Sequence, residues 1–497
     1  MEAPKICLTL TCETIAEDLE LVNKYRSYID MAELRVDFLR QDERLYVRRF
    51  PQMAGLPCIL TIRRAAEGGR FVEGESARTV LFARALSFAE DDRSKNFAYV
   101  DFEEDFHVSS LEDATHSFET RIIRSFHDMK SPVTQVREKL KDLCTSGFEI
   151  PKIAFMPKTL SDVTNLFDEA RQLRANGQIL LAMGNIGLST RVLGYQLKNF
   201  LTYTAAPETL GNVANIAQLD AVKLDDLYRV RSITESTKIY GVTGWPLAAT
   251  SSPELHNRGY CRHKLDAVYI PIPAEDFSEA LTFADKVGVQ GLSVTVPHKE
   301  AALAKAHIID SAALEIGSCN TLVKSDGQWQ AFNTDWEGFL KALLEFTRLK
   351  NLKGKRISII GAGGAAKAVA YAVAKSGGKA CVFNRTLSKA KALAERYKFK
   401  FAPLSSEALP VIKKYSDIIV QTTSKGMGST EPPSAENDPL YFYDFQGSET
   451  VFDIVYEPKT TAIMARAKTA GCKVSNGFSM LLYQGYKQFQ IYTGVEY

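Results

Sequence analysis

The sequence predicts an α/β protein in which an N-terminal (β/α)8 barrel is followed by a two-lobed α/β region with a Rossmann-like domain. Three observations predict it. Eight short apolar runs alternate with helical patterns over roughly the first 230 residues. Ionisable residues gather near the ends of those runs. In the second half, an apolar run ends in a glycine-rich turn that opens another helical pattern.

The eight apolar runs are the expected barrel strands. Between them, apolar positions recur every three or four residues, as on one face of a helix. Eight such units within about 230 residues fit a (β/α)8 barrel, although a doubly wound open sheet would give a similar alternation. The expected strands are residues 5–11, 31–37, 57–63, 97–103, 121–126, 151–156, 179–184 and 199–204, and helical patterns occupy 14–28, 74–89, 133–143 and 161–175.

Length and composition exclude several classes of function. A chain of 497 residues has room for two to four domains at roughly 150 residues each. Its net charge of +2 is too balanced for a protein that wraps nucleic acid, and no apolar run approaches the roughly 18 to 20 residues of a membrane span. Eight scattered cysteines without a C-x-x-C pair indicate reduced thiols, so we expect no structural zinc. The first residues lack a signal or transit pattern, which favours a cytoplasmic protein, in a bacterial cytoplasm above all.

Charged side chains follow several of the expected strands. In a barrel, residues at the carboxyl ends of the strands converge on one mouth. Arginines, a lysine and a histidine at that mouth predict an anionic substrate, gripped as a carboxylate by guanidinium groups. The residues concerned are Glu33, Arg35, Arg63, Glu67, His127, Lys152 and Arg191.

Lys152 lies inside an apolar strand pattern, I-P-K-I-A-F-M-P. A desolvated lysine near other cations has a lowered pKa and can attack a carbonyl to form a Schiff base; the alternative is a lysine that extends to solvent from a strand edge. His127 could move protons beside the imine or be structural. Glu67 could orient that histidine or be a solvated loop carboxylate.

Four motifs of the first half resemble type I 3-dehydroquinate dehydratase: E-L-R-V-D, T-I-R-R-A-A-E-G-G, R-S-F-H-D and I-P-K-I-A, in that order within residues 4–230. The resemblance implies that Lys152 forms the imine, His127 is the general acid/base and Glu67 assists it. It also implies a set of substrate-binding residues, namely Thr9 (where a serine is frequent), Glu33, Arg35, Arg63 and Arg191.

The last barrel loop departs from the family pattern. The family usually has S-A-P-G-Q, whereas this chain has the longer A-A-P-E-T-L-G-N-V-A-N-I-A-Q. Alignment on the following L-D-A-V-K-L-D-D-L-Y makes Gln218 the family's glutamine and puts Ala214 in place of its serine. We therefore expect Gln218 to bind substrate, and the serine's role to be unfilled or supplied by a neighbour.

A nucleotide-binding pattern dominates the second half. The sequence R-I-S-I-I-G-A-G-G-A-A is an apolar strand, a glycine turn and a helix start, with a second strand at 380–384. Glycines let the backbone approach a pyrophosphate at the helix N-terminus. The second strand ends in Asn384, Arg385 and Thr386, at the position where an NAD site would carry an acidic residue. A guanidinium group in place of the acid suits the 2′-phosphate of NADP. The alternative is that Arg385 is only a surface residue. The expected cofactor-binding residues are Gly361, Ala362, Gly363, Gly364, Ala365, Asn384, Arg385, Thr386 and Lys389.

Three further motifs place hydroxyls, amides and charges beside strands or turns, as recognition of a polyol requires: G-L-S-V-T-V-P-H-K-E, S-C-N-T-L-V and F-N-T-D-W-E-G. A ketone that accepts a hydride needs a proton on its oxygen, and we assign Lys299 and Asp335 to that transfer. Taken separately, each could be a surface charge.

These motifs together resemble shikimate dehydrogenase over about residues 239–497. The match includes G-W-P-L-A-A-T-S-S-P, in which Ala249 replaces a frequent histidine; Ser293 stands where an asparagine is usual. The resemblance implies that Lys299 is catalytic and that the 422–427 stretch, Ile454 and Gly477 lie on the nicotinamide side. It implies these substrate-binding residues: Thr250, Ser252, Thr295, Asn320, Tyr456 and Gln484.

The resemblances imply a bifunctional enzyme that converts 3-dehydroquinate to 3-dehydroshikimate and then to shikimate with NADP(H), with no nucleic-acid or membrane partner. Two alternatives stay open: a dehydrogenase half that prefers quinate, and one half that is a degenerate binding or scaffold domain. A metal-dependent barrel enzyme is disfavoured, since the mouth offers arginines where ligands would be needed. The expected domains are 1–230 (barrel), 231–238 (linker), 239–338 (substrate-binding), 339–474 (NADP-binding) and 475–497 (a C-terminal helix that returns to the substrate domain).

Overall fold

The computed structural model describes residues 3–86, 92–173, 177–216, 218–247 and 250–497. Contacts divide the chain into two compact units, Met1–Val289 and Gln290–Tyr497, and each is described by itself. The five segments drawn from the sequence, and the boundaries between them, stay predictions. Ala249 and the ends of two expected helical patterns, at 87–89 and 174–175, lie outside the described residues.

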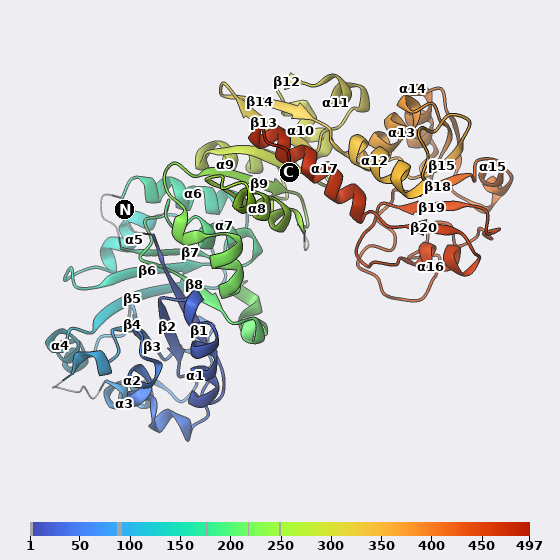
Figure 1. Cartoon of the computed structure of the whole chain (residues 1–497). Helices are drawn as coiled ribbons and strands as arrows, with labels where there is room; N and C mark the ends of the chain where they lie inside the picture. Colours follow the sequence, from blue (N-terminus) through green and yellow to red (C-terminus); the bar gives the residue numbers. More distant parts are fainter. Residues whose placement is uncertain (1–2, 87–91, 174–176, 217, 248–249) are drawn as a thin grey trace. The chain divides into compact units, whose positions relative to one another are not determined.

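The first unit is built around eight parallel strands, which confirms the predicted (β/α)8 barrel (Figure 1). Neighbours pair in the order β7-β6-β5-β4-β3-β2-β1-β8, so each strand except the first and last in this series lies between two others. Each strand falls on one of the expected runs, shifted by no more than about two residues in most cases. The strands are β1 (Lys5–Leu10), β2 (Met31–Arg35), β3 (Cys58–Thr61), β4 (Tyr99–Glu103), β5 (Arg121–Asp128), β6 (Ile150–Phe155), β7 (Ile179–Ala182) and β8 (Leu201–Ala205).

A side chain helps to close the barrel between β7 and β8. The two strands meet through a parallel bridge between Gln178 and Asn199. The Asn199 amide then accepts from the backbone N–H of Leu180 at 2.9 Å and donates to its carbonyl at 3.0 Å. Asn199 thus supplies the two hydrogen bonds that a neighbouring backbone would otherwise make.

Short helices connect the strands. Helix α1 begins with a reciprocal capping box between Thr14 and Glu17, which satisfies two backbone donors at the helix start. After β8 the chain forms 3-10 turns (Pro207–Ile216) and a π turn (Lys223–Leu227). The helices of the barrel are α1 (Ile15–Lys24), α2 (Phe50–Ala54), α3 (Glu75–Ala85), α4 (Ser109–Ser117), α5 (Val136–Asp142), α6 (Leu160–Arg171) and α7 (Leu188–Val192).

Four elements complete the first unit: β9 (Lys238–Thr243), α8 (Ser252–Arg262), β10 (Ala267–Pro271) and α9 (Phe277–Val287). Strands β9 and β10 pair in parallel. Helix α9 packs on α6, where the buried rings of Phe167 and Phe283 meet edge to face at 5.7 Å between centroids. Ser161 donates to Glu279 at 2.8 Å beside them.

The second unit begins with a small mixed sheet. Strand β13 (Thr321–Ser325) pairs antiparallel with β11 (Val289–Val294) and with β14 (Gln328–Phe332). Strand β12 (Ile308–Ile309) pairs in parallel with β14. Helices α10 (Lys299–Lys305) and α11 (Ser311–Ile316) belong to this part.

A second sheet in this unit is entirely parallel. Its order, β17-β16-β15-β18-β19-β20, is that of a dinucleotide-binding fold, with the order reversing between β15 and β18, and it confirms the Rossmann-like prediction. The strands are β15 (Arg356–Ile360), β16 (Lys379–Asn384), β17 (Lys400–Pro403), β18 (Ile418–Gln421), β19 (Thr450–Asp453) and β20 (Lys473–Ser475), with helices α13 (Gly364–Lys375), α14 (Leu387–Arg396), α15 (Leu409–Lys414) and α16 (Ala462–Thr469).

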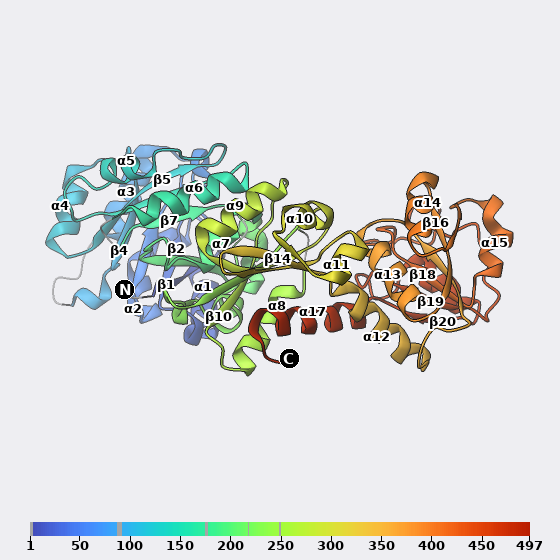
Figure 2. The same cartoon turned by 90° about the horizontal axis from the view of Figure 1, so that it is seen from above.

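Two long helices run side by side in this unit, α12 (Asp335–Thr347) and α17 (Phe478–Thr493) (Figure 2). Gly338 lets them approach, because a Cβ there would lie 2.7 Å from the backbone nitrogen of Gln484. Within the described residues, no helix is both long and apolar enough to cross a bilayer.

Candidate active sites

The barrel interior changes from apolar to polar along the strands. Alternate residues of a strand face the same side, so positions two apart share the interior. Toward the amino ends these positions form a buried apolar core that includes Cys7, Met31, Ile59, Ile123, Ile150, Ile179 and Leu201. The next interior position of each of these strands lies two residues further along. These positions are occupied, in the same order, by Thr9, Glu33, Thr61, Ser125, Lys152, Leu181 and Tyr203.

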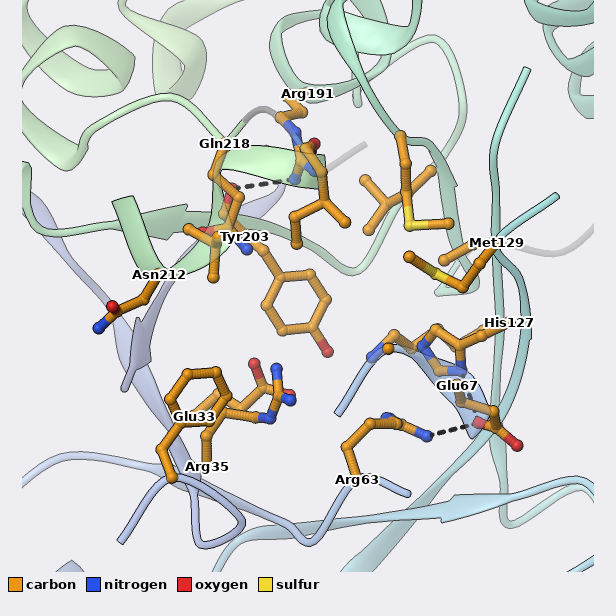
Figure 3. A pocket seen from close by; sticks show the side chains of 18 residues that line it. Glu33, Arg35, Arg63, Glu67, His127, Met129, Arg191, Tyr203, Asn212 and Gln218 are labelled. Atoms are coloured by element: carbon orange, nitrogen blue, oxygen red, sulfur yellow. Dashed lines mark hydrogen bonds and ion pairs between the residues drawn. The ribbon is translucent and has the colours of Figure 1, made fainter. Parts of the chain in front are cut away.

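A cavity lies at the carboxyl ends of the strands, above this change (Figure 3). It brings together the predicted residues Glu33, Arg35, Arg63, Glu67, His127, Lys152, Arg191 and Gln218. Thr9 is not in its lining. The lining residues that we did not single out from the sequence are Phe38, Gly68, Met129, Ala154, Leu181, Met183, Tyr203, Asn212, Val213 and Ile216.

Lys152 is buried, with 5% of its surface exposed, and its Nζ lies 2.8 Å from Oδ2 of Asp101. Asp101 also pairs with Arg63 at 2.8 Å and accepts from the Ser125 hydroxyl at 2.5 Å. Burial alone would raise the pKa of Asp101, but Arg63 and Lys152 outweigh it and hold the pKa far below its usual range. The amine is therefore held by a fixed carboxylate that sequence reasoning did not identify.

His127 and Glu67 form a second pair beside the lysine. Nδ1 of His127 lies 3.3 Å from Oε2 of Glu67, close enough for an ion pair although the atoms lack hydrogen-bond alignment. Burial, together with the positive charges of Arg63 and Lys152, lowers the pKa of His127 to about 3. Glu67 raises this pKa but does not outweigh the other effects. The imidazole is thus neutral near pH 7 and free to accept a proton.

A tight turn places Glu67 at this position. The turn Ala65–Glu67 ends at Gly68, whose φ is +79°, and the next residue, Gly69, leaves no room for a side chain because a Cβ would lie 2.2 Å from the Arg63 carbonyl. The turn therefore favours glycine at position 68 and requires it at position 69. Although burial raises the pKa of Glu67, the close contact with His127 and the charge of Arg63 lower it to about 2.

The three predicted arginines have different partners. Arg35 binds Asp37 through two hydrogen bonds of 2.9 and 2.8 Å. Arg63 is surrounded by carboxylates, among them Asp101 and Glu103 at 2.8 Å each. Arg191 is buried and, among the described residues, pairs with no carboxylate: it donates to the carbonyls of Tyr203 and Ile216, and its Nε has no partner.

An uncompensated buried guanidinium is costly, and burial lowers the pKa of Arg191 to about 10. Of the three arginines, Arg191 is thus the one whose charge a bound anion would balance.

The opposite wall is formed by Glu33 and the last loop. Glu33 accepts from the hydroxyls of Thr9 at 3.1 Å and Thr61 at 2.9 Å. Gln218 donates weakly to Thr9 at 3.5 Å, and its buried Oε1 has no partner. Ala214 is exposed and is not among the residues that line this cavity, so nothing at that position supplies a hydroxyl.

The glycine turn in the second unit connects β15 to α13. Gly361 has φ +114°, and a Cβ would lie 2.6 Å from Oγ1 of Thr422 at the end of β18, so only glycine fits. A Cβ on Gly363 would meet nothing within 4 Å. Helix α13 starts with no side-chain cap and no acid in its first turn, which leaves its N–H groups available to an anion. The turn therefore fits a dinucleotide pyrophosphate.

The end of β16 carries cations and no acid. Arg385, Thr386 and Lys389 are exposed, and Asn384 donates to the Thr386 carbonyl at 3.0 Å. In the part of the chain that the structure describes, the Arg385 side chain makes no ion pair or hydrogen bond. A free guanidinium here suits an additional phosphate better than a bare ribose hydroxyl.

A polar network in the same unit contains four predicted residues. Nζ of Lys299 lies 2.5 Å from Oδ2 of Asp335, and Asn320 donates to the other oxygen of Asp335 at 2.9 Å. The same amide donates to Oε1 of Gln484 at 3.1 Å and to Thr334, which the sequence did not single out. A Cβ on Gly364 would lie 3.4 Å from the Lys299 side chain, so this network adjoins the nucleotide turn.

The remaining predicted residues are placed as follows. In the first unit, the Thr250 hydroxyl donates to Ser252 at 3.2 Å, at the start of α8. In the second unit Thr295 is partly buried after β11, and Ile454 and Tyr456 are partly buried after β19. Gly477 lies against the backbone of Ile454: a Cβ on Gly477 would be 2.0 Å from the Ile454 carbonyl oxygen.

Comparisons with known proteins identify both halves. The family described as type I 3-dehydroquinase matches residues 6–235, the shikimate dehydrogenase substrate binding domain matches 242–322, and shikimate / quinate 5-dehydrogenase matches 344–431. A shikimate dehydrogenase (NADP(+)) from Thermococcus kodakarensis is 39% identical over 263 residues, which cover 52% of this chain and 92% of that protein.

The chain belongs to the shikimate dehydrogenase family and carries a type I 3-dehydroquinase domain before it. A chloroplastic bifunctional 3-dehydroquinate dehydratase/shikimate dehydrogenase from Arabidopsis thaliana is similar over the whole length: 29% identity over 521 residues, 99% of this chain and 82% of that protein. A solved shikimate dehydrogenase from Aquifex aeolicus is 36% identical, with a TM-score of 0.48, over 53% of this chain and 96% of that one.

One departure from the shikimate dehydrogenase pattern is accommodated locally. Ser293, where asparagine was expected, is buried, and its hydroxyl contacts Gln488 and Tyr492 of α17 at 3.0 Å each. The side chain thus joins β11 to the C-terminal helix. Within the described residues, no group of three or more His, Cys, Asp or Glu side chains could hold a metal ion.

Proposed function

We infer that the chain dehydrates 3-dehydroquinate to 3-dehydroshikimate in its barrel and reduces the product to shikimate with NADPH in its second half. The observation that carries the first activity is the buried Lys152, beside a neutral His127 and in a cavity whose Arg191 pairs with no carboxylate. These groups supply a nucleophile, a base and an anion site for a keto acid.

In the dehydration, Nζ of Lys152 attacks the ketone carbon, and loss of one water gives an imine. The neutral imidazole of His127 then takes a proton from the carbon next to the imine carbon. Returning that proton to the neighbouring hydroxyl releases a second water and leaves a carbon–carbon double bond conjugated with the imine. Hydrolysis of the imine consumes one water, frees the enone and regenerates Lys152.

The other predicted residues hold the substrate and the catalytic groups in this scheme. Arg191 binds the substrate carboxylate, and Gln218 and Glu33 bind oxygens of the ring. Arg63 is ion-paired with Glu67 at 3.1 Å as well as with Asp101. We therefore assign Arg63 to positioning the carboxylates that contact His127 and Lys152. Arg35 acts as part of its pair with Asp37.

NADP(H) is the cofactor of the second half, and when bound it supplies the hydride. The N–H groups at the start of α13 would hold its pyrophosphate, while Arg385 and Lys389, with Asn384 and Thr386, would bind its 2′-phosphate. The relatives' names support this choice, since the shikimate dehydrogenases from Syntrophobacter fumaroxidans and Thermococcus kodakarensis are both named for NADP(+).

Lys299 and Asp335 move the proton that the reduction requires. The ammonium group of Lys299 places a proton on the ketone oxygen as that oxygen becomes a hydroxyl, and Asp335 keeps the lysine positioned. Asn320 holds Asp335 from the other side and shares its amide with Gln484. We propose that Thr295 and Tyr456, in the same unit, help to bind the polyol; Thr250 and Ser252, in the first unit, stay predicted substrate-binding residues.

The test supplies the purified chain with 3-dehydroquinate and NADPH together, and follows enone formation and NADPH consumption in the same sample. Consumption of NADPH with production of shikimate is the expected result. Enone that accumulates without NADPH consumption would contradict the second activity; quinate or shikimate with NAD or NADP would then determine whether the domain prefers quinate. No enone from 3-dehydroquinate, with 3-dehydroshikimate still reduced, would contradict the first.

We further propose that the protein works in a cytoplasm. All eight cysteines are free, five of them buried, which suits a reducing compartment.

A further inference from the structure

Tyr203 lines the barrel cavity and carries a hydroxyl that no proposed step uses. It comes from β8, its side chain is almost fully buried, and its hydroxyl has no hydrogen-bond partner among the described residues. Figure 3 shows the ring projecting into the middle of the lining residues, with the hydroxyl at its tip. A buried hydroxyl without a partner costs free energy, so its position needs a reason.

The two carboxylates whose charges act on this hydroxyl, Glu33 and Asp101, already have partners. The two oxygens of Glu33 accept from Thr9 and Thr61, and Asp101 accepts from Lys152 and Ser125 and pairs with Arg63. Burial raises the pKa of Tyr203 well above its ordinary value, and Glu33 and Asp101 add to that rise, so the phenol keeps its proton. The cavity therefore contains a hydrogen-bond donor that the protein does not use.

The ring is held between the two groups that define the substrate's position. Nζ of Lys152 lies 4.6 Å from the centre of the Tyr203 ring, a cation–π contact. Arg191 donates to the backbone carbonyl of Tyr203 at 3.4 Å. Tyr203 thus contacts both the nucleophile and the anion-binding residue through parts other than its hydroxyl, which fixes where the hydroxyl points.

Given the dehydratase activity proposed above, we propose that the Tyr203 hydroxyl donates a hydrogen bond to an oxygen on the substrate ring, between the carboxylate bound by Arg191 and the carbon that joins Lys152. Tyr203 is then a substrate-binding and positioning residue of the barrel, and the hydroxyl obtains a partner only when substrate is bound.

The test is Tyr203→Phe, which removes one oxygen and keeps the ring over Lys152. We expect kcat/KM for 3-dehydroquinate to fall by about tenfold or more, since a buried hydroxyl of the substrate loses its partner. Thermal unfolding should occur at the same temperature or higher, because the missing hydroxyl had no partner in the free protein. A purely structural hydroxyl would give the opposite pair of results: lower stability and unchanged kinetics.

Three controls make the outcome specific. Reduction of 3-dehydroshikimate by the same sample should be unchanged, and Tyr228→Phe, at a buried tyrosine that is not among the cavity-lining residues, should leave both activities unchanged. Borohydride trapping of substrate on Lys152 should still occur in Tyr203→Phe, at higher substrate concentration. A kcat/KM within twofold of wild type would overturn the proposal, whereas a wild-type chain with no dehydratase activity would overturn the proposed function instead.

Discussion

Oδ2 of Asp101 lies 2.8 Å from Nζ of Lys152, and the other oxygen of the same carboxylate lies 2.8 Å from a nitrogen of Arg63. One buried acid thus pairs with two buried cations, of which Arg63 also pairs with Glu67 and Glu103. The amine that must attack a ketone is held by a carboxylate on β4, and that carboxylate is held in turn by an arginine from the loop after β3.

Replacing Asp101 with asparagine should therefore affect both folding and catalysis. Asp101→Asn leaves Lys152 and Arg63 without their shared counter-charge, and breaking such a buried pair costs about 3–5 kcal/mol of the free energy of unfolding. We expect that loss in urea denaturation, with a fall in dehydratase kcat. Asp105→Asn, which breaks an exposed pair with Arg64, is the control and should cost no more than about 1 kcal/mol.

Lys152→Ala should abolish dehydration and leave the reductase unchanged, because only the first reaction needs an imine. The measurement is enone formation from 3-dehydroquinate, together with borohydride trapping followed by mass spectrometry. Lys139→Ala, which removes a lysine of α5 paired with Glu104, should retain both signals. Normal dehydration by Lys152→Ala would show that the imine assignment is wrong.

The buried histidine predicts a pH dependence of stability. His127 has a pKa of about 3 when folded, lowered chiefly by burial, and an ordinary value near 6.5 when unfolded. Between these values the unfolded chain binds more protons, so the histidine's contribution to stability is complete above pH 6.5 and falls with decreasing pH, by up to about 1.4 kcal/mol per pH unit.

The measurement is the difference in free energy of unfolding between wild type and His127→Gln, from pH 8 to pH 5. We expect this difference to be constant at high pH. Below about pH 6.5 the wild type should lose stability relative to His127→Gln as the pH falls. His107→Gln, at an exposed histidine, is the control. A difference that is flat over the whole range would contradict a neutral, buried imidazole.

Arg385→Ala should weaken NADPH binding much more than NADH binding. The side chain is exposed and makes no ion pair or hydrogen bond within the described residues, so the change should remove the proposed contact with the 2′-phosphate without disturbing the fold. We expect KM for NADPH to rise about tenfold, equivalent to roughly 1.4 kcal/mol. Lys391→Ala, on the exposed face of α14, is the control; equal effects on both cofactors would refute the assignment.

Two glycines of the nucleotide turn should respond differently to alanine. Gly361→Ala forces a side chain into left-handed backbone and to within 2.6 Å of Thr422 Oγ1, which should cost about 1–3 kcal/mol of stability. Gly363→Ala meets nothing within 4 Å and has φ −87°, so its stability should stay close to wild type. Thermal unfolding of the two variants provides the comparison.

Much of the fold was predictable because the strand signal is strong. Eight apolar runs, each short and bounded by helical patterns, correspond to β1 through β8. The positions of Glu33, Lys152 and His127 followed from the rule that barrel residues near the strand ends share one mouth, and the cavity brings them together.

The partners of these residues were harder to predict. Asp101 carries the same signal as Glu33, an acid alternating with apolar residues in Y-V-D-F-E, and could have been identified. Sequence alone could not show that Arg35 pairs with Asp37 while Arg191 pairs with no carboxylate of the described residues, since this depends on which side chains meet in space. A tyrosine in a strand is commonly a core residue, so Tyr203 needed the structure.

The packing of α9 on α6 has a consequence for how this polypeptide could be divided. Proteolysis between residues 231 and 238 would leave Phe167 on one fragment and Phe283 on the other, each exposing an apolar helix face that is now buried. The fragments should therefore remain associated after cleavage. If the two activities were encoded as separate chains, polar residues on these two helix faces would replace the apolar ones that now meet.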